Sequence, residues 1–261
     1  MATTIVVPYH HDDRLPDGLV PAPGTEPPTV VDPELPTGDR WTRMAALHEA
    51  VAATVASSPL PVTVLSGDCL VAPAVLTGAQ RAGLDPALIW FDAHGDVHTL
   101  ETTTSGYLGG LSLRLAMGAH PELLAERSGM RPVPEDRVVL VGARDLDPPE
   151  TAYLEASRVR RSPVADLSAA DLPEGPLIVH VDVDVVDSGE LPGLLFPAPD
   201  GPAGPEVAAA GAPIPATGRR AAGRGGWGRR RPPGPGPPAA WPCSTSRARG
   251  GRRGSRTSGR S

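Results

Sequence analysis

The chain has 261 residues, of which 40% are hydrophobic, so it is long enough to bury one large core or two small ones. Its two cysteines cannot form a disulfide framework, which excludes a small disulfide-stapled domain and favours a reducing compartment. All 30 acidic residues lie within residues 1–206, whereas 12 of the 24 basic residues follow residue 218. We expect a cytoplasmic protein, since the sequence shows no signal peptide and no apolar run of about 20 residues that would span a membrane.

Strand-like and helix-like segments alternate along the chain. Apolar runs rich in β-branched residues predict strands at residues 3–9, 62–65, 87–91, 137–141 and 177–181, and a weaker strand near Val164. Helical periodicity predicts helices at residues 41–56, 72–82 and 111–117. The strand runs are continuously apolar rather than alternating, which is typical of strands buried on both faces. We therefore predict an α/β fold, a three-layer αβα arrangement with a mostly parallel sheet.

Acidic and imidazole residues follow two of the predicted strands at alternate positions. Asp92, His94 and Asp96 come directly after residues 87–91, and Asp182 and Asp184 follow residues 177–181. Ligands of open parallel sheets bind beyond the carboxyl ends of the strands, so both groups should meet at one rim. A donor set of carboxylates with one imidazole favours Mn²⁺ over metals that prefer thiolates. The alternative is that these carboxylates only cap loops or helices, but two such groups at strand ends favour a metal site.

Four motifs together resemble the arginase/agmatinase/formimidoylglutamase family, the ureohydrolases. They are Leu-Ser-Gly-Asp at residues 65–68, Phe-Asp-Ala-His-Gly-Asp at 91–96, Thr-Thr-Thr-Ser-Gly-Tyr at 102–107 and Val-Asp-Val-Asp-Val-Val-Asp at 181–187. The motifs occur in the order and approximate spacing of that family, and the resemblance covers roughly residues 3 to 200. It implies an arginase-like fold and a metal-dependent hydrolase that cleaves a C–N bond of a guanidino or related compound.

The resemblance also implies a mechanism and a ligand set. Two Mn²⁺ ions would lower the pKa of a bridging water, and the resulting metal-bound hydroxide would attack a guanidinium carbon. Asp96 would take the hydroxide proton and pass it to the leaving amine. The metal ligands implied by the resemblance are Asp92, His94, Asp96, Asp182 and Asp184.

The sequence departs from the family pattern at two places in the predicted site. Cys69 stands where the family usually has a histidine ligand, and a thiolate there would shift the metal toward Zn²⁺ or Fe²⁺; the alternative is a buried inert cysteine. Leu-Gly-Gly at residues 108–110 replaces the histidine that arginases place after their Ser-Gly loop. His98 is the nearest imidazole, with either a substrate-binding or a packing role. Ser105 corresponds to a contact with the amino-acid end of the substrate, unless it only caps its loop.

The composition divides the chain near residue 200. Residues 1–200 form the predicted arginase-like metallohydrolase domain, and residues 201–261 are rich in Gly, Pro and Arg. No acidic residue follows Glu206, so the acid that family members use to hold the guanidinium is missing and the fold is predicted to be incomplete at its C-terminal end. We hypothesise a shifted reading frame, because out-of-frame reading of a GC-rich gene yields such residues and the chain has no lysine. A natural disordered tail is the alternative.

Several other functions were weighed against the hydrolase. A catalytically impaired, metal-binding family remnant is favoured by Cys69, Gly109 and the missing acid. A metal-dependent glycosyltransferase could use Asp182 and Asp184, but it does not need the second cluster. We predict a small guanidino substrate as the partner and no association with a membrane. The family commonly forms homo-oligomers. Nucleic acid is not expected, because the arginine-rich tail has only Trp227 and Trp241 for base stacking.

Overall fold

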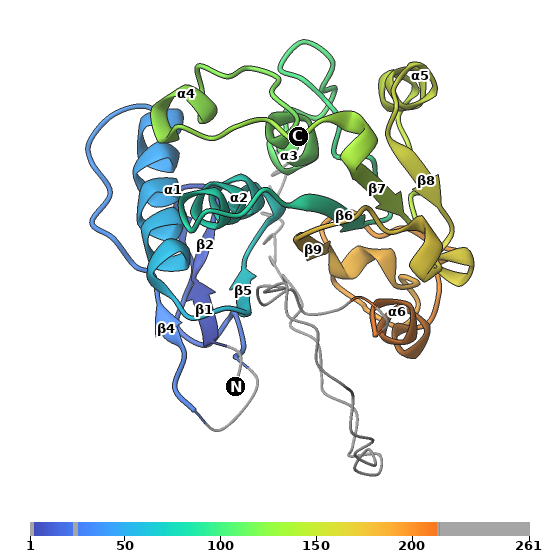
Figure 1. The fold of residues 1–261 in the computed structure, drawn as a ribbon, viewed down its shortest axis with the longest axis horizontal. Coiled ribbons are helices and arrows are strands. Elements are labelled where there is room, and N and C mark those ends of the chain that lie inside the picture. The colour runs from blue at the N-terminus through green and yellow to red at the C-terminus, as the bar shows by residue number, and fades with distance from the viewer. Residues whose placement is uncertain (1–2, 23–25, 213, 215–261) are drawn as a thin grey trace, which may run out of the picture.

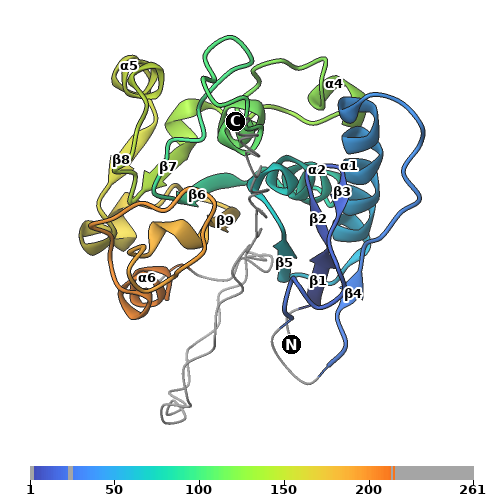
Figure 2. The same cartoon turned by 180° about the vertical axis from the view of Figure 1, so that it is seen from behind.

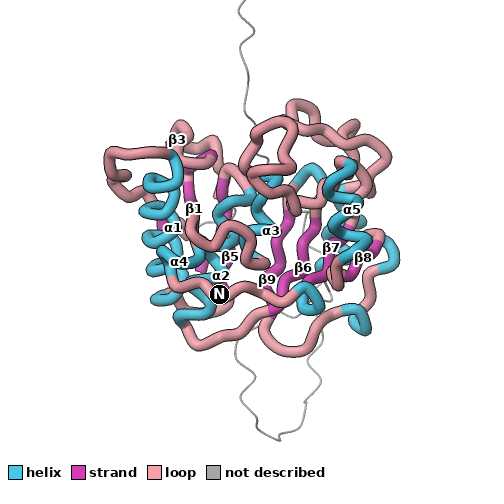
Figure 3. The backbone as a smooth tube through the Cα atoms, turned by 90° about the horizontal axis from the view of Figure 1, so that it is seen from above, coloured by secondary structure: helices cyan, strands magenta, loops and turns pink. Residues whose placement is uncertain are grey.

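The computed structural model describes residues 3–22, 26–212 and 214, and its centre consists of two parallel β-sheets that lie edge to edge (Figures 1 and 3). The first sheet has the order β4 (Thr29–Val30), β1 (Thr3–Val7) and β5 (Val62–Ser66). The second has the order β8 (Arg160–Ser162), β7 (Val138–Val141), β6 (Ala87–Phe91) and β9 (Leu177–Val181). A short antiparallel hairpin joins β2 (Tyr9–His10) and β3 (Asp13–Arg14). All strand pairs in the two central sheets are parallel, as predicted.

Helices cover both faces of the sheets. They are α1 (Arg40–Ser57), α2 (Ala72–Arg81), α3 (Ser112–Ala116), α4 (Ala125–Ser128), α5 (Pro148–Ala156) and α6 (Gly204–Gly211). Short 3₁₀ helices lie at Cys69–Val71, Gly109–Leu111, Glu135–Arg137, Val164–Asp166, Ala169–Asp171 and Val183–Val185. In Figures 1 and 2, α6 lies on the opposite side of β6 and β9 from α2 and α3. The three-layer α/β prediction is therefore confirmed.

The central strand β6 explains why two helical layers are needed. All five of its residues are buried, and alternate side chains point to opposite faces. Leu88 and Trp90 pack in one apolar cluster with residues of α2 and α3, whereas Ile89 and Phe91 pack in another with Val207 of α6. A strand that is apolar on both faces is stable only between two covering layers. Its carboxyl end then delivers the following residues to the rim of the sheet.

Two predicted elements differ from the structure. The helix predicted to begin at Leu111 is α3, only five residues long, and Gly118 with a φ of +99° follows its end. The weak strand predicted near Val164 is instead β8 at Arg160–Ser162, with Val164 in a 3₁₀ turn. Pro163 separates the two, because proline has no N–H to donate to a strand ladder.

Helix α6 lies beyond residue 200, where the composition suggested a boundary. The Glu206 carboxylate accepts a hydrogen bond of 2.8 Å from the Ala203 N–H, and Val207 is buried in the core. A short alanine-rich helix is stable when a side chain accepts a hydrogen bond from a backbone N–H at its N-terminus and one apolar residue packs in the core. Residues 215–261, to which most of the frame-shift hypothesis refers, lie outside the described residues. In the described part of the chain, no helix is both long and apolar enough to cross a membrane.

Candidate metal centre

Asp92 is the first residue after β6 and is held by two hydrogen bonds. Its Oδ2 accepts one of 3.1 Å from the Trp90 indole N–H, and its Oδ1 accepts one of 2.8 Å from the His94 backbone N–H. Asp92 is 1% exposed. Both bonds come from residues within two positions of Asp92, so the local sequence after the strand fixes the direction of this carboxylate.

The loop after β9 is tied directly to the loop after β6. Asp182 donates its backbone N–H to the Phe91 carbonyl at 2.8 Å, which continues the β6–β9 ladder by one step. The Asp182 Oδ1 accepts from the Asp184 N–H at 3.0 Å, and the Asp184 Oδ1 accepts from the Ala93 N–H at 3.1 Å. Both aspartates are therefore fixed by backbone donors at the rim where the sequence predicted them.

Three ligands form a compact set, which we call the His94 group: Asp92, His94 and Asp184. One ligand atom from each lies within 4.8 Å of the others. The His94 Nδ1 is 3.1 Å from the Asp184 Oδ2 and 3.4 Å from the Asp92 Oδ1. Burial lowers the pKa of His94, but the hydrogen bonds to Asp184 and Asp92 outweigh burial and raise it to about 11. The imidazolium thus supplies the positive charge that these two carboxylates require.

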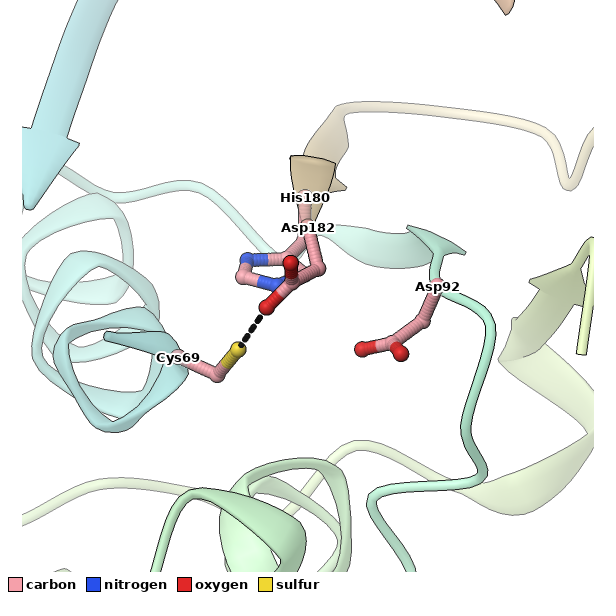
Figure 4. Close-up of side chains that lie close together, drawn as sticks. All are labelled: Cys69, Asp92, His180 and Asp182. Carbon is pink, nitrogen blue, oxygen red and sulfur yellow. Dashed lines mark hydrogen bonds between the residues drawn. The ribbon is translucent and has the colours of Figure 1, made fainter. Parts of the chain in front are cut away.

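A second set, the Cys69 group, consists of Cys69, Asp92, His180 and Asp182 (Figure 4). Cys69 comes from the turn after β5, and its Sγ donates a hydrogen bond of 2.9 Å to the Asp182 Oδ2. Burial, followed by the nearby Asp182, Asp96 and Asp92 carboxylates, raises the thiol pKa well above its ordinary value. Cys69 is therefore a protonated donor here, and a bound cation would have to displace that proton before sulfur could act as a ligand.

His180 belongs to this group although the sequence analysis did not single it out. Its ring stacks on Trp90 with a centroid distance of 3.7 Å and an interplanar angle of 23°. Burial lowers its pKa to about 3, so the ring is neutral, and its buried Nε2 has no hydrogen-bond partner among the described residues. The available signal was spacing: His180, Asp182 and Asp184 continue the alternate pattern back into the strand.

Asp96 completes the acidic rim. It is 5% exposed, it adopts the left-handed region with a φ of +51°, and its Oδ2 has no hydrogen-bond partner in the described part of the chain. Burial and then the Asp92, Asp182 and Asp184 charges raise its pKa well above the ordinary value. Burial likewise raises the pKa of Asp92, and that of Asp182 to about 6. Buried carboxylates this close repel each other, and an oxygen-rich set with imidazole nitrogen fits a divalent cation such as Mn²⁺.

Two charged residues for which the sequence predicted no role stabilise the loops of the rim. Arg144 donates to the carbonyls of Asp184 at 3.1 Å, Val185 at 3.0 Å and Pro199 at 2.8 Å, so it clasps the loop after β9. Glu150 is 4% exposed and accepts from the Val97 N–H at 3.3 Å. A Cβ on Gly95 would lie 2.7 Å from the Glu150 carboxylate, so a side chain at this position in the Asp92–Asp96 loop would displace Glu150.

The two predicted substrate residues lie apart from both ligand groups. The His98 ring nitrogens are 3.1 Å from the Thr102 Oγ1 in the same loop and 3.1 Å from the Asp147 Oδ2, which directly precedes α5, so both nitrogens have partners. Ser105 is exposed, and its Oγ accepts from the Tyr107 N–H at 3.2 Å. These contacts agree with a packing role for His98 and a loop-capping role for Ser105. The substrate-binding roles of the two residues stay predictions.

A third set of potential ligands, His10, His11 and Asp68, lies after β1 and β5. The His11 backbone N–H donates to the Asp68 carboxylate, and the His10 and His11 rings stack at a centroid distance of 4.3 Å. The Tyr107 hydroxyl is 3.4 Å from the His10 Nε2, which connects this set to the loop containing Ser105. This set forms one side of the rim.

The fold and this rim define an α/β protein whose parallel strands end in buried carboxylate and imidazole ligands. The chain belongs to the Arginase family, whose sequence model matches residues 25–214. It is 32% identical over 177 residues to N(omega)-hydroxy-L-arginine amidinohydrolase of Streptomyces lavendulae, a match that covers 66% of this chain and 62% of that protein. It is also 32% identical over 155 residues to the arginase of Bacillus subtilis (strain 168), covering 53% and 51% of the two chains. The chain therefore spans only about half to three fifths of these curated relatives.

Solved structures agree with the family assignment at the level of the fold. The arginase from Bacillus cereus superposes with a TM-score of 0.67 at 23% identity, covering 80% of this chain and 84% of that one. The formimidoylglutamase from Bacillus subtilis subsp. subtilis str. 168 gives a TM-score of 0.57 at 17% identity, covering 82% and 74%. The predicted membership of the ureohydrolase family is confirmed, and a glycosyltransferase function loses its support.

Proposed function

We propose that the chain is a metal-dependent hydrolase of the ureohydrolase type, which cleaves a C–N bond of a small guanidino or related compound. One observation carries the proposal: five carboxylate and imidazole side chains from two strand ends converge at one buried rim. These residues are Asp92, His94, Asp96, Asp182 and Asp184. Membership of the Arginase family supports the same chemistry.

The His94 group and the Cys69 group would hold two divalent cations, with Asp92 common to both. Mn²⁺ is the metal that suits the carboxylates and His94, whereas Zn²⁺ or Fe²⁺ would suit a deprotonated Cys69 better. Bound cations at such a site act as Lewis acids that lower the pKa of water and polarise the substrate. The remaining chemistry falls to the side chains of the chain itself.

Asp96 is the residue that would carry the proton. Its Oδ2 is buried without a hydrogen-bond partner in the described residues, so the oxygen is available to accept one. Burial and the neighbouring carboxylates raise the pKa of Asp96, which favours a role for this side chain in carrying a proton. Asp96 would accept a proton from the attacking water at this oxygen and return it to the nitrogen of the leaving amine.

The mouth of the rim suits a small cationic substrate. The exposed Asp145 carboxylate lies 3.8 Å from the His94 Nε2 and adds negative charge. The Tyr107 and Phe196 rings lie 4.8 Å apart, and Phe196 is also 6.3 Å from the His94 ring. A guanidinium can stack on aromatic faces while the acidic rim attracts its charge. Ser105, in the loop beside Tyr107, would contact the other end of the substrate, and His98 would position that loop.

The test is a turnover assay on the full chain loaded with Mn²⁺, Zn²⁺ or Fe²⁺ in separate samples. The substrates and readouts are arginine and agmatine with urea, N-hydroxyarginine with hydroxyurea, and formimidoylglutamate with formamide. We expect release from at least one compound, and at least a 100-fold lower rate in the D96N variant when the two proteins are compared at equal bound metal. Release that is equal in D96N would contradict the role of Asp96.

A second candidate function is a catalytically impaired protein that still binds metal. The Cys69 thiol favours it, because the protonated Sγ is already committed to the Asp182 carboxylate at 2.9 Å. Tight metal binding without turnover of any of the four compounds would select this alternative. Resequencing the gene across residues 202–218 and assaying a frame-restored version beside this chain would test whether a shifted reading frame causes the loss. Self-association, also predicted, is measured on the same samples by mass photometry.

A further inference from the structure

The β2–β3 hairpin carries two adjacent histidines that take no part in the proposed function. His10 is the last residue of β2, and His11 begins the two-residue turn that leads to β3. His11 adopts the left-handed region with a φ of +54°, which is uncommon for a residue that has a side chain. A residue is held in this region only where the surrounding contacts determine it. The contacts around the hairpin therefore set the direction of the His11 ring.

The turn of the hairpin is fixed to helix α1, which lies beside it (Figure 2). The Asp12 carboxylate pairs with Arg40 at 3.1 Å and with Arg43 at 2.7 Å, and Asp12 is only 8% exposed. Arg43 also donates to the Asp12 carbonyl at 3.2 Å. Charge-assisted hydrogen bonds to both the side chain and the backbone hold this turn firmly. The two histidines are thus oriented before any ligand binds.

The turn after β5 packs against the same hairpin. The Gly67 N–H donates to the Tyr9 carbonyl at 3.0 Å, and a Cβ on Gly67 would overlap with that oxygen, so the two turns approach closely. One oxygen of the Asp68 carboxylate accepts from the His11 N–H, and the other accepts from the Leu70 N–H at 2.8 Å. These contacts bring Asp68 to the histidines, although it lies 57 positions from His11 in sequence.

His11 has a buried nitrogen that the described protein leaves unsatisfied. The residue is 8% exposed, and its Nε2 has no hydrogen-bond partner among the described residues. Burial lowers the pKa of His11 although the Asp68 carboxylate opposes this effect, so the ring is neutral at pH 7. A buried polar atom without a protein partner is usually satisfied by water or an ion, and neutral imidazole is the form that binds metals. One ring nitrogen from each histidine and one Asp68 oxygen lie within 4.8 Å of one another.

We propose that His10, His11 and Asp68 form a third metal site, which binds one Zn²⁺ and is separate from the proposed hydrolase centre. The set shares no residue with the His94 group or the Cys69 group. Two imidazoles and one carboxylate are typical of zinc sites with three protein ligands and a water in the fourth position. The other two groups contain more carboxylates and suit Mn²⁺, whereas this set is richer in imidazole nitrogen and suits Zn²⁺.

The role of this zinc ion would be structural. It would connect the β2–β3 hairpin to the turn after β5, which are distant in sequence. The Tyr107 hydroxyl lies 3.4 Å from the His10 Nε2, so the loop containing Ser105 also borders the site. A ligand that binds the folded chain alone stabilises it, and this ion would therefore hold one side of the rim in place.

Counting bound Zn²⁺ ions tests the site. Equilibrium dialysis followed by elemental mass spectrometry should show one ion fewer in H11N than in the full parent chain, whatever number the other groups bind. Asparagine tolerates the left-handed backbone at this position, but its amide is a poor zinc ligand. The matched control is H120N: His120 also has a positive φ, of +45°, and belongs to none of the three ligand groups. H120N should bind as many ions as the parent.

A C69S/D92N variant isolates the site, because it removes ligands from both other groups. When its histidines are labelled with ¹⁵N, Zn²⁺ should shift the ring-nitrogen resonances of His10 and His11 and leave those of His48 and His120 unchanged. Adding H11N to this variant should weaken Zn²⁺ affinity at least about 100-fold. H10Q is a second ligand variant with the same expected loss, and circular dichroism of the metal-free proteins establishes that each one folds.

Three results would each overturn the proposal: equal zinc content in the parent and H11N, no Zn²⁺ binding by folded C69S/D92N, or unshifted ring nitrogens of His10 and His11. The loss of one ion in H11N, but not in H120N, supports the site even if the chain hydrolyses no guanidino compound. The third site and the proposed hydrolase function can therefore fail separately.

Discussion

The His94 group and the Cys69 group share Asp92 but are built in different ways. In the His94 group, the carboxylates are oriented by backbone donors from adjacent loops, and Arg144 holds the loop after β9 from behind. In the Cys69 group, Cys69 comes from the other sheet, and one thiol–carboxylate hydrogen bond joins residues 113 positions apart in sequence. His180 contributes a nitrogen with no hydrogen-bond partner in the described residues. The first group is fixed by local structure, whereas the second depends on how the two sheets are held together.

This difference has a consequence for metal binding. Both groups release a proton when they bind a cation, from the His94 imidazolium in one and from the Cys69 thiol in the other. The ligands of the His94 group are already oriented and lose little further freedom, whereas the Cys69 group spans two sheets and must first be ordered. We therefore expect the His94 group to be the tighter site. The predictions below separate the two groups, beginning with the largest effect.

Replacing Arg144 with glutamine should damage the support of the His94 group most. R144Q leaves the Asp184, Val185 and Pro199 carbonyls without their guanidinium donor, so the free energy of unfolding in urea should fall by about 3–4 kcal/mol. The control is R160Q, an exposed position on β8, where the change should stay below about 0.5 kcal/mol. A loss below about 1 kcal/mol in R144Q would show that the loop after β9 does not need this clasp.

Replacing Asp92 with asparagine should affect both groups together. D92N removes the shared carboxylate, and we expect Mn²⁺ affinity by calorimetry to fall at least about 100-fold. The metal-free variant should nevertheless be more stable than the parent, because it has one fewer buried charge next to Asp96, Asp182 and Asp184. The matched control is D166N on the exposed surface. Unchanged metal affinity in D92N would show that Asp92 is not a ligand shared by the two groups.

His48 makes the stability of the side of the molecule that carries Cys69 depend on pH. His48 is fully buried on α1 against the Leu70 backbone, and burial lowers its pKa to about 4. Because the unfolded chain binds a proton at a pKa near 6.5, stability is present above that value and is lost as pH falls toward 4. Between pH 7 and pH 5 the loss should be about 2 kcal/mol.

Urea denaturation of the parent and of H48Q at both pH values isolates this contribution, since all other groups are common to the two proteins. The pH dependence should be smaller in H48Q by about the same 2 kcal/mol. Equal pH dependence in the two proteins would mean that folding does not lower the pKa of His48.

Replacing Cys69 with histidine should give the smallest effect, confined to the Cys69 group. C69H exchanges a thiol for a neutral imidazole, so the ratio of Mn²⁺ to Zn²⁺ affinity at the weaker site should rise about tenfold. C69S is the control, because it keeps a hydrogen-bond donor for Asp182 without a soft ligand. If C69H and C69S give the same metal preference, Cys69 has a packing role only.

The sequence predicted the features that depend on local patterns. The parallel α/β fold follows from continuous apolar runs such as residues 87–91, and the rim follows because Asp92 and Asp182 stand directly after such runs. Parallel strands bring their carboxyl ends to one edge, which is sufficient to place these ligands together without knowledge of the rest of the chain.

The features that the sequence did not predict depend on contacts between distant segments. Arg144 acts on carbonyls about 40 to 55 positions away, and no local pattern indicates which loop would fold over it. Glu150 is buried against the loop of Gly95 in the same manner. The division of the described strands into two sheets was also not predicted, because sequence periodicity identifies strands but not their neighbours.

The most direct test of the central claim is a titration of the metal-free full chain with Mn²⁺, followed by electron paramagnetic resonance. We expect two ions bound per chain, the first to the His94 group and the second more weakly, with a spin-coupled signal because both sites share Asp92. In D92N the coupled signal should disappear. Failure to bind Mn²⁺, or two ions that bind equally well and without coupling in both the parent and D92N, would contradict the account.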